Sequence, residues 1–476
     1  KIMRNNKLFI LLPDGVGLRN FAFTNFHKNA KARGLDVVFW NNTPFDLKAL
    51  DFDEIRIHHA KAHPLTNMFK IAQTRIELAL SIKKSKDLVY NSYKFPFAYP
   101  DLKHVIKNWY VHLLIFWYNS EKGLDKVREK IAQNERKTKL YFDSLDTLKK
   151  EKPAMVFCTN QRTMLAVAPI LAAQDLGIPT ASVIYSWDNL PKATKIVEPD
   201  FYFVWSDYMK KELVYYYPHV KEEQIIVTGT PQFEPHFDPE MLCSRAAFFE
   251  QHGLDVNKKY ICFSGDDLVS SPHDPVYLDD TAKAIRELNR NGHQLGIIFR
   301  RCPVDFSDRF DAVLEKNKDV VTPIVPIWEK IAEGWHTILP TKEDLILQMN
   351  TIHHTELVVN LGSSMVFDYV AFGKPCAYFN YNVKNDLYKS WAAEKVYNFM
   401  HFRSMPSPKA VFWINDAQSI SDLLLKMLGE SKKEAIDNAQ LWFEKINQHP
   451  ASEASKRIID SLEHIINNQV VSETSK

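Results

Sequence analysis

The hydrophobic residues of this chain fall into short continuous runs that alternate with segments of helical periodicity. The first run, Lys7-Leu-Phe-Ile-Leu-Leu12, is followed by a turn and by an amphipathic stretch from Asn20 to Arg33. Two further runs lie at 35–40 and 55–58. Continuous apolar strands separated by helices are typical of a parallel sheet covered on both faces. The pattern therefore predicts an α/β fold.

The alternation is interrupted once and then resumes. Residues 60–150 are rich in lysine and aromatic residues and have helical periodicity, so we expect a helical insertion there. After it, the chain contains nine further runs of strand length: 154–159, 180–185, 201–205, 224–228, 260–264, 294–299, 320–325, 357–360 and 376–379. From residue 421 onward only helical spacing remains, which predicts a helical tail.

These blocks predict two doubly wound domains. We expect an N-terminal Rossmann-like domain at 1–230, a proline-rich linker at 231–240, a C-terminal Rossmann-like domain at 241–420 and helices at 421–476. Ligands of such sheets bind outside the carboxyl ends of the strands. The expected ligand site is therefore a cleft that the two domains face.

Composition restricts the partners and the compartment. The 476 residues include 60 Lys+Arg against 58 Asp+Glu, and a net charge of +2 gives no broad field for a polyanion such as nucleic acid. The five cysteines are widely spaced and contain no C-x-x-C pair, which is typical of a reducing compartment. The longest aromatic and aliphatic run, Tyr110 to Tyr118, is about half of a membrane span. We therefore expect a cytoplasmic protein.

The clearest chemical signal follows the strand at 357–360. Gly362 comes after this strand, and Ser363 and Ser364 are expected to cap the next helix. A helix start with free N–H groups and two hydroxyls is suited to an anion such as a diphosphate. Asp368, about one turn further on, lies in an apolar context and needs a polar partner. We expect it to accept hydrogen bonds from the sugar of a nucleotide.

The motif Gly-Ser-Ser-x-x-x-Asp-x-x-x-x-Gly-Lys-Pro at 362–375 resembles the nucleotide-binding end of GT-B glycosyltransferases. It is most similar to that of the CDP-glycerol glycerophosphotransferases and the bacterial capsule and surface-polysaccharide transferases. Segments 186–190 and 227–233 are also similar to parts of surface-carbohydrate transferases, so the resemblance extends over roughly 154–380. It implies a nucleotide-sugar donor on the C-terminal domain, an acceptor on the N-terminal one, and no cofactor or obligatory metal.

Three more features of the C-terminal half are expected at the donor site. The family's Arg/Lys-x-His-Pro strand end is present as Arg300-Arg301-Cys302-Pro303, with cysteine in place of histidine. Two guanidinium groups there can offer paired donors to a phosphate. Gly265, after the strand at 260–264, permits close approach of a ligand. Thr341 is predicted to be a helix N-cap with Asp344 as a capping-box partner, and the resembling folds place this corner near the base.

The turn after the first strand is the candidate acceptor loop. Gly15 and Gly17 lack the third glycine of a dinucleotide fingerprint, and the second strand ends without an acidic residue. We expect these glycines and Asn20 to face the acceptor. Asp14 is a candidate general base for the acceptor hydroxyl.

Two other residues compete for the role of general base. Asp188, in a strand-end loop between Trp187 and Asn189, ranks evenly with Asp14, and His27 ranks third. A general base must reach the proton geometrically, and the sequence leaves that choice open.

The function expected from these features is transfer of a sugar from a nucleotide-sugar donor to a saccharide or glycolipid acceptor in cell-surface polysaccharide biosynthesis. Three alternatives remain: a CDP-polyol phosphotransferase, a nucleotide-sugar 2-epimerase and a non-catalytic sugar-nucleotide-binding protein. Residues 90–118 combine lysines with large aromatic residues. They are expected either to touch the inner face of the cell membrane or to pack as an insertion helix.

Overall fold

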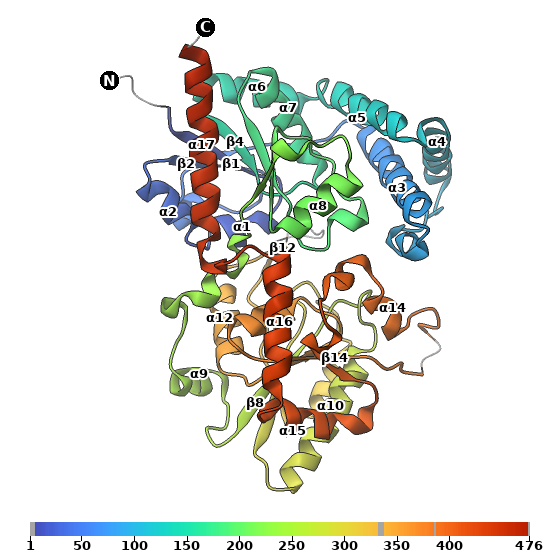
Figure 1. Ribbon diagram of the computed structural model, residues 1–476, viewed down its shortest axis with the longest axis vertical. Coiled ribbons are helices and arrows are strands. Elements are labelled where there is room, and N and C mark those ends of the chain that lie inside the picture. Colours follow the sequence, from blue (N-terminus) through green and yellow to red (C-terminus); the bar gives the residue numbers. More distant parts are fainter. Residues whose placement is uncertain (1–4, 332–337, 385–386, 475–476) are drawn as a thin grey trace. The chain divides into compact units, whose positions relative to one another are not determined.

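The computed structural model describes residues 5–331, 338–384 and 387–474. The chain divides into two compact units (Figure 1). Unit 1 contains residues 5–231 and 446–474, and unit 2 contains residues 232–331 and 338–445. Each unit is built on its own parallel sheet, as the alternation of apolar runs and helices predicted.

The sheet of unit 1 has seven strands in the order β3-β2-β1-β4-β5-β6-β7, and every neighbouring pair is parallel. Its strands are β1 (Lys7–Leu12), β2 (Asp36–Asn41), β3 (Glu54–Arg56), β4 (Met155–Cys158), β5 (Thr180–Val183), β6 (Phe201–Val204) and β7 (Ile225–Val227). The central strands are buried because their apolar residues point to both faces.

Helices cover both faces of this sheet. They are α1 (Val16–Phe21), α2 (Phe26–Ala32), α3 (Thr66–Ser85), α4 (Leu102–Tyr118), α5 (Glu121–Glu135), α6 (Lys139–Glu151), α7 (Val167–Asp175), α8 (Asp207–Tyr216) and α17 (Ala454–Thr474). On one face, Phe21 and Phe26 lie 5.2 Å and 6.5 Å from Phe157 of β4, measured between ring centroids. Residues of α3 to α7 pack with Phe9 and Leu11 on the other face. The helical insertion predicted at 60–150 is thus confirmed.

The sheet of unit 2 has six parallel strands in the order β10-β9-β8-β13-β14-β15. Its strands are β8 (Lys259–Ser264), β9 (Leu295–Arg300), β10 (Val321–Pro323), β13 (Val358–Asn360), β14 (Cys376–Phe379) and β15 (Phe412–Ile414), and β11 (Glu329–Lys330) pairs with β12 (Ile338–Leu339) outside it. The strand β15 has no counterpart in the predicted set, because three residues at the sheet edge form too short an apolar run.

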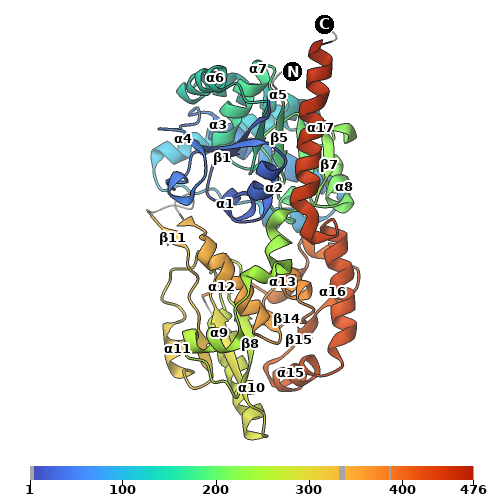
Figure 2. The same ribbon diagram turned by 90° about the vertical axis from the view of Figure 1, so that its left-hand side faces the viewer.

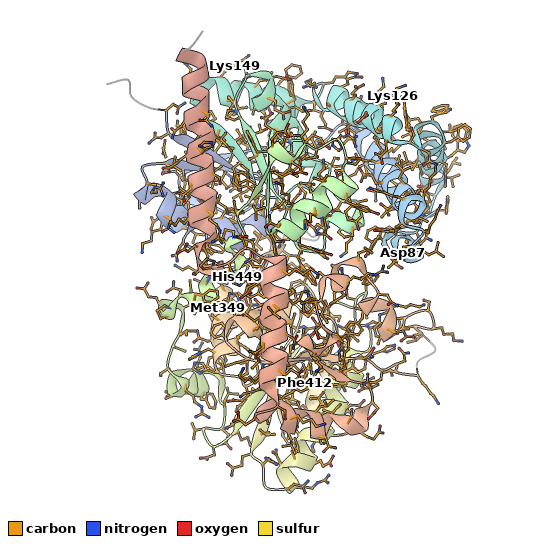
Figure 3. The ribbon with its side chains drawn as sticks, in the orientation of Figure 1. Asp87, Lys126, Lys149, Met349, Phe412 and His449 are labelled. Atoms are coloured by element: carbon orange, nitrogen blue, oxygen red, sulfur yellow. The ribbon has the colours of Figure 1, made fainter. Side chains whose placement is uncertain are left out.

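The helices of unit 2 also lie on both faces. They are α9 (Arg245–His252), α10 (Asp274–Arg290), α11 (Asp311–Lys316), α12 (Lys342–His353), α13 (Met365–Ala371), α14 (Ala393–Tyr397), α15 (Ile420–Leu428) and α16 (Lys432–Ile446). Figure 3 labels Phe412 on β15 and Met349 on α12, and Met349 is fully buried. Trp442 and Phe443 of α16 pack on Phe367 of α13.

The chain passes from unit 1 to unit 2 at the start of the predicted linker, and the rest of that linker is packed. It forms two short 3-10 helices, Pro231–Phe237 and Pro239–Met241. Phe233 and His236 are buried in this segment. The segment is therefore an ordered part of the fold and not a loose linker.

The predicted C-terminal helices belong to different units. The helix α16 lies in unit 2 except for its last residue, and α17 packs beside α2 in unit 1 (Figure 2). Arg33 pairs with Asp460 at 2.9 Å and with Glu463. Nε of Arg457 donates to the carbonyl oxygen of Thr228 at 2.6 Å.

A buried carboxyl group in unit 1 links stability to pH. Glu77 on α3 is buried and accepts a hydrogen bond at 2.9 Å from Nε2 of Gln73. Burial raises the pKa of Glu77 from its ordinary value of 4.5 to about 8. The folded chain therefore holds a proton at this site between about pH 4.5 and pH 8 that the unfolded chain releases.

We predict that Glu77→Gln protects the fold at alkaline pH. Because the folded pKa is above the unfolded one, the wild type loses stability relative to the variant as pH rises through this window, by on the order of 5 kcal/mol at pH 9. Urea unfolding at several pH values measures the difference. The exposed Glu121→Gln variant is the control and should follow the wild type, and parallel pH profiles for wild type and Glu77→Gln would contradict the prediction.

Candidate functional site

The strand order reverses once in each sheet. In unit 1 the chain moves outward from β1 to β2 and β3 on one side and from β4 to β7 on the other, so the reversal lies between β1 and β4. In unit 2 the corresponding reversal lies between β8 and β13. Loops at the carboxyl ends of two such strands diverge and leave a crevice where ligands of doubly wound sheets bind. The position of each candidate residue is therefore described relative to these two reversal points.

Asp14 lies at the reversal point of unit 1. Its Oδ2 accepts hydrogen bonds from Nδ2 of Asn160 at 2.8 Å and from Oγ1 of Thr163 at 2.7 Å, and its Oδ1 accepts from the backbone N–H of Val16 at 3.2 Å. Asp14 comes after β1 and Asn160 comes after β4. These donors fix the direction of a half-buried carboxylate. Within the described part of the chain, Asp14 forms no ion pair.

Asp188, the equally ranked candidate, has a different environment. It follows β5 and pairs with Nζ of Lys192, one helical turn further on. Its Oδ1 also accepts a hydrogen bond at 3.1 Å from Nδ2 of Asn189. A carboxylate paired with an ammonium group is a weaker proton acceptor than one held by neutral donors. The two aspartates are thus distinguished by their partners.

Sequence reasoning missed the cationic residues near Asp14. Nζ of Lys70 on α3 donates to the carbonyl oxygen of Arg162 at 2.6 Å. Burial, with a smaller contribution from the Arg162 charge, lowers the pKa of Lys70 to about 8, whereas the charge of Asp14 acts in the opposite direction. A signal for Arg162 was present in the sequence, because residues 160–163 directly follow a predicted strand. Asp14 was selected for the same reason.

Two residues of the predicted acceptor loop pack within unit 1. A Cβ atom on Gly17 would lie 2.3 Å from Oγ1 of Thr159, so the glycine is required for α1 to approach β4. Gly15 has an ordinary φ of −77°, and Asn20 is buried. Gly17 and Asn20 therefore have packing roles, and contact of this loop with an acceptor stays a prediction.

His27 lies against aromatic side chains away from Asp14. Its ring stacks on Phe39 and meets Phe52 edge-on at a centroid distance of 4.7 Å. Burial, more than the nearby Lys31 charge, lowers the pKa of His27. It has no described contact with Asp14 or Asp188.

The motif at 362–375 occupies the reversal point of unit 2, but its geometry differs from the expected one. Gly362 has φ of +64°, and a Cβ there would lie 2.9 Å from Val396, so the chain itself fills the space beside it. The hydroxyl of Ser363 accepts from the N–H of Met365 at 3.3 Å, whereas Ser364, at the N-cap position, makes no capping hydrogen bond. The expected double cap is therefore a single one, made by Ser363.

Asp368 has a partner within unit 2. Its Oδ1 lies 2.7 Å from Nε2 of His236, and both side chains are buried. Nδ1 of His236 faces the carbonyl oxygen of Phe233 at 3.1 Å. Because a carbonyl oxygen can only accept, Nδ1 of His236 is the donor of this bond. Oδ1 of Asp368 is thus occupied by His236, and the contact of Asp368 with a ribose stays a prediction.

The two arginines also have partners within the chain. Nη2 of Arg300 forms a buried ion pair with Asp344, with distances of 3.1 Å and 2.9 Å to the two carboxylate oxygens. Arg301 lies 3.6 Å from Asp305 and donates to the carbonyl oxygen of Ser307. Nη1 of Arg300 is buried and has no hydrogen-bond partner among the described residues. Both guanidinium groups therefore have partners within the chain, and their contact with a phosphate stays a prediction.

Thr341 caps α12 as predicted, but Asp344 does not complete a capping box. Oγ1 of Thr341 accepts from the N–H of Asp344 at 3.1 Å. The Asp344 carboxylate instead accepts from Arg300, from the N–H of Ile327 and from Nε1 of Trp328. Burial alone would raise the pKa of Asp344, but the Arg300 charge and these donors hold it below its ordinary value. Asp344 is thus a structural partner of Arg300.

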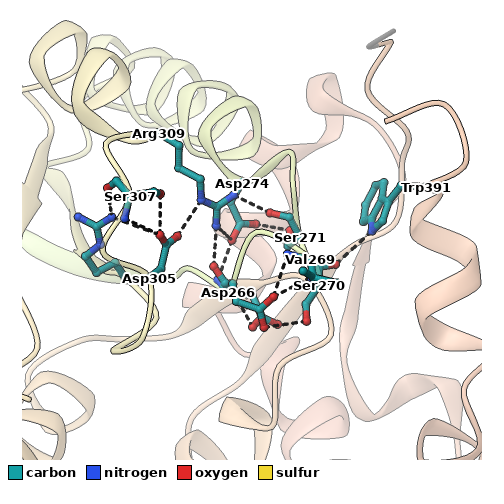
Figure 4. Close-up of polar contacts among 11 residues, drawn as sticks. Asp266, Val269, Ser270, Ser271, Asp274, Asp305, Ser307, Arg309 and Trp391 are labelled. Carbon is teal, nitrogen blue, oxygen red and sulfur yellow. Dashed lines mark hydrogen bonds and ion pairs between the residues drawn. The ribbon is translucent and has the colours of Figure 1, made fainter. Parts of the chain in front are cut away.

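A polar cluster that sequence reasoning missed orders the loop after β8 (Figure 4). Arg309 donates to the carbonyl oxygens of Asp266 at 2.6 Å and Ser271 at 2.8 Å. Oδ2 of Asp274 accepts from the N–H of Asp266 at 2.7 Å. Burial is the main cause that raises the pKa of Asp266 and of Asp274 to about 7. Gly265 precedes this loop, so the backbone at the reversal point of unit 2 is rigidly held.

We predict that Arg300 and Arg301 contribute unequally to stability. Arg300→Met leaves the Asp344 carboxylate buried without its cation and should cost about 3–5 kcal/mol of unfolding free energy. Arg301→Met is the matched control; its pair is longer and more exposed, so it should cost about 1 kcal/mol or less. Urea denaturation measures both values. An Arg300→Met variant as stable as the wild type would contradict the prediction.

Comparison with known proteins supports the fold and does not identify the activity. No protein-family model matches the chain, and a search of curated proteins finds no relative. Three solved structures are similar over nearly their full length. They are MnaA of S. aureus with UDP (13% identity, TM-score 0.52, 97% of each chain), a Listeria monocytogenes protein provisionally named UDP-N-acetylglucosamine 2-epimerase (11%, 0.55, 96% of each) and a Rickettsia africae glycosyltransferase (10%, 0.51, 98% of each).

At these identities the likeness defines a fold class. Two Rossmann-like units, with parallel sheets of seven and six strands and a helical tail, make this chain a member of the GT-B fold. The fold predicted from the sequence is therefore confirmed.

Proposed function

We propose that this protein is a glycosyltransferase that moves a sugar from a nucleotide-sugar donor to a saccharide or glycolipid acceptor in cell-surface polysaccharide biosynthesis. The observation that carries the proposal is the environment of Asp14. This half-buried carboxylate is aimed by three neutral donors at the reversal point of unit 1. A group held in this way is suited to accept a proton from a hydroxyl that binds in the crevice.

The donor is assigned to unit 2. The N–H of Ser363 donates to Oδ1 of Asn360 at 2.8 Å, and the N–H of Met365 donates to Ser363. The backbone N–H and the hydroxyl of Ser364, which makes no capping bond, lie at the reversal point and are the donors offered to the ligand. Arg309 and the Asp266–Asp274 contact hold the loop that follows β8 in place. Oriented N–H and O–H donors that need no rearrangement stabilise charge developing on a leaving diphosphate. In this proposal Arg300 and Asp368 support the site through their buried partners.

The transfer is proposed to proceed with inversion. The acceptor oxygen forms a bond to the anomeric carbon while the bond from that carbon to the diphosphate oxygen breaks. The hydroxyl proton passes to Asp14, and the diphosphate leaves with the bonding electrons. Asp14 is preferred over Asp188 as the base because Lys192 already neutralises Asp188.

The two aspartates can be separated by kinetics. A thermal-shift screen of UDP, GDP, CDP, ADP and CMP first selects the donor nucleotide, since a saturating ligand raises the unfolding temperature. With the corresponding nucleotide sugar, Asp14→Asn should lower kcat by about 10²–10⁴-fold, the usual contribution of a general base, and leave donor affinity unchanged. Asp188→Asn is the matched control and should change kcat by less than about tenfold.

The same assay distinguishes the remaining candidates. Equal turnover in Asp14→Asn and wild type would remove Asp14 as the base. Isomerised nucleotide sugar without an acceptor would indicate a 2-epimerase, and release of a nucleoside monophosphate would indicate a polyol-phosphate transferase. Nucleotide binding without any product would indicate a binding protein.

A further inference from the structure

The exposed side of α4 is apolar, which is the reverse of an ordinary surface helix. Six large hydrophobic residues of this helix are exposed: Leu102, Val105, Ile106, Trp109, Phe116 and Trp117. Most of them recur at intervals of three or four residues and therefore lie along one side of the helix. We call these six residues the outer face of α4.

The inner side of the helix is fixed in unit 1, so the outer face is held outward. Val111 and Leu114 are buried in the core of the unit, and α4 packs against α3 and α5 (Figure 1). Asn108 donates to the carbonyl oxygen of Ala98 at 2.8 Å. This bond fastens the preceding loop, whose Phe95 and Tyr99 are exposed, beside the helix.

The charged side chains of α4 itself are all basic. The helix Leu102–Tyr118 contains Lys103 and Lys107 and no acidic residue. Asp101 precedes it and is occupied as the N-cap, accepting from the N–H of His104 at 2.9 Å. Lys94 adds a further positive charge in the adjoining loop. The net charge of the whole chain is only +2, so this combination of cations and apolar side chains is a local feature.

We propose that the outer face of α4 docks on an anionic lipid surface. Amphipathic helices that carry Trp, Phe and Leu together with lysines lie in the interface of such membranes, where acyl chains receive the apolar residues and headgroups receive the ammonium groups. The helix has 17 residues, the lower limit for a span, and no described helix is long and apolar enough to cross a bilayer.

A second copy of the chain is a poorer occupant of this face. A two-fold interface would place the lysines of one copy opposite those of the other, and no acidic residue of α4 would compensate them. Lysine is also depleted in the buried centres of protein interfaces. A membrane with anionic headgroups satisfies both the charge and the apolar surface. If the proposed function holds, this contact would bring unit 1 to a lipid-linked acceptor.

Vesicle sedimentation tests the docking with the full-length chain. The wild type should bind phosphatidylcholine vesicles containing phosphatidylglycerol at least about tenfold more strongly than vesicles of phosphatidylcholine alone, and salt should weaken this binding. Replacing both Trp109 and Phe116 with serine should reduce binding by more than about tenfold. Lys103→Glu should reduce only the preference for anionic vesicles.

Phe142→Ser is the matched control, because Phe142 is an exposed aromatic residue on α6 of the same unit, and it should bind as the wild type does. The Asp14→Asn variant should also bind vesicles as the wild type does. The docking proposal can therefore hold even if Asp14 is not the catalytic base. The proposal is overturned if the wild type binds neither kind of vesicle. It is also overturned if the variant with serine at both 109 and 116 binds as strongly as the wild type. It is also overturned if the chain dimerises in solution and the Trp109 and Phe116 substitutions abolish the dimer.

Discussion

The parallel direction of the strands is the constraint on which the rest of this structure depends. When all strands of a sheet point the same way, every strand-to-helix loop opens at one edge, and a reversal of strand order separates two of these loops. In each unit the chain makes one such reversal, at β1 and β4 or at β8 and β13. Asp14 and the segment from Gly362 to Ser364 reach their positions for this reason.

Desolvation decides which polar residues remain available at these edges. A charge taken into the interior must be paired, so Arg300 is matched with Asp344 and Asp368 with His236. Such pairs shape the loops but leave few lone pairs or protons for a ligand. Asp14 and Ser364 are different, because neither is part of a described ion pair or, for Ser364, of a capping bond. The proposed chemistry therefore rests on neutral contacts and backbone groups.

The sequence predicted the sheets well because their signal is local. A run such as residues 7–12 is apolar on both faces wherever it lies, and Thr341 caps its helix through a residue only three positions away. The same rule about strand ends placed Asp14 and Gly362 correctly at the loops. The strand β15 was not predicted, because a three-residue edge strand carries almost no periodic signal.

The partners of the site residues could not be predicted, because they are distant in the sequence. Asp14 meets a residue 146 positions away, and Asp368 meets one 132 positions away. The topology of the fold decides which loops come together. The spacing of residues along the sequence does not reveal these long-range contacts. The arginine pair predicted to contact a phosphate illustrates the consequence: Arg300 lies at a strand end, as expected, but its partner Asp344 comes from α12.

The central claim is that a nucleotide binds at the reversal point of unit 2. Hydrogen–deuterium exchange of the wild type, with and without the nucleotide that gives the largest thermal shift, tests it most directly. The account predicts slower exchange at the amides of residues 264–270 and 361–366. Protection confined to unit 1, or no protection with any of the five nucleotides, would contradict it.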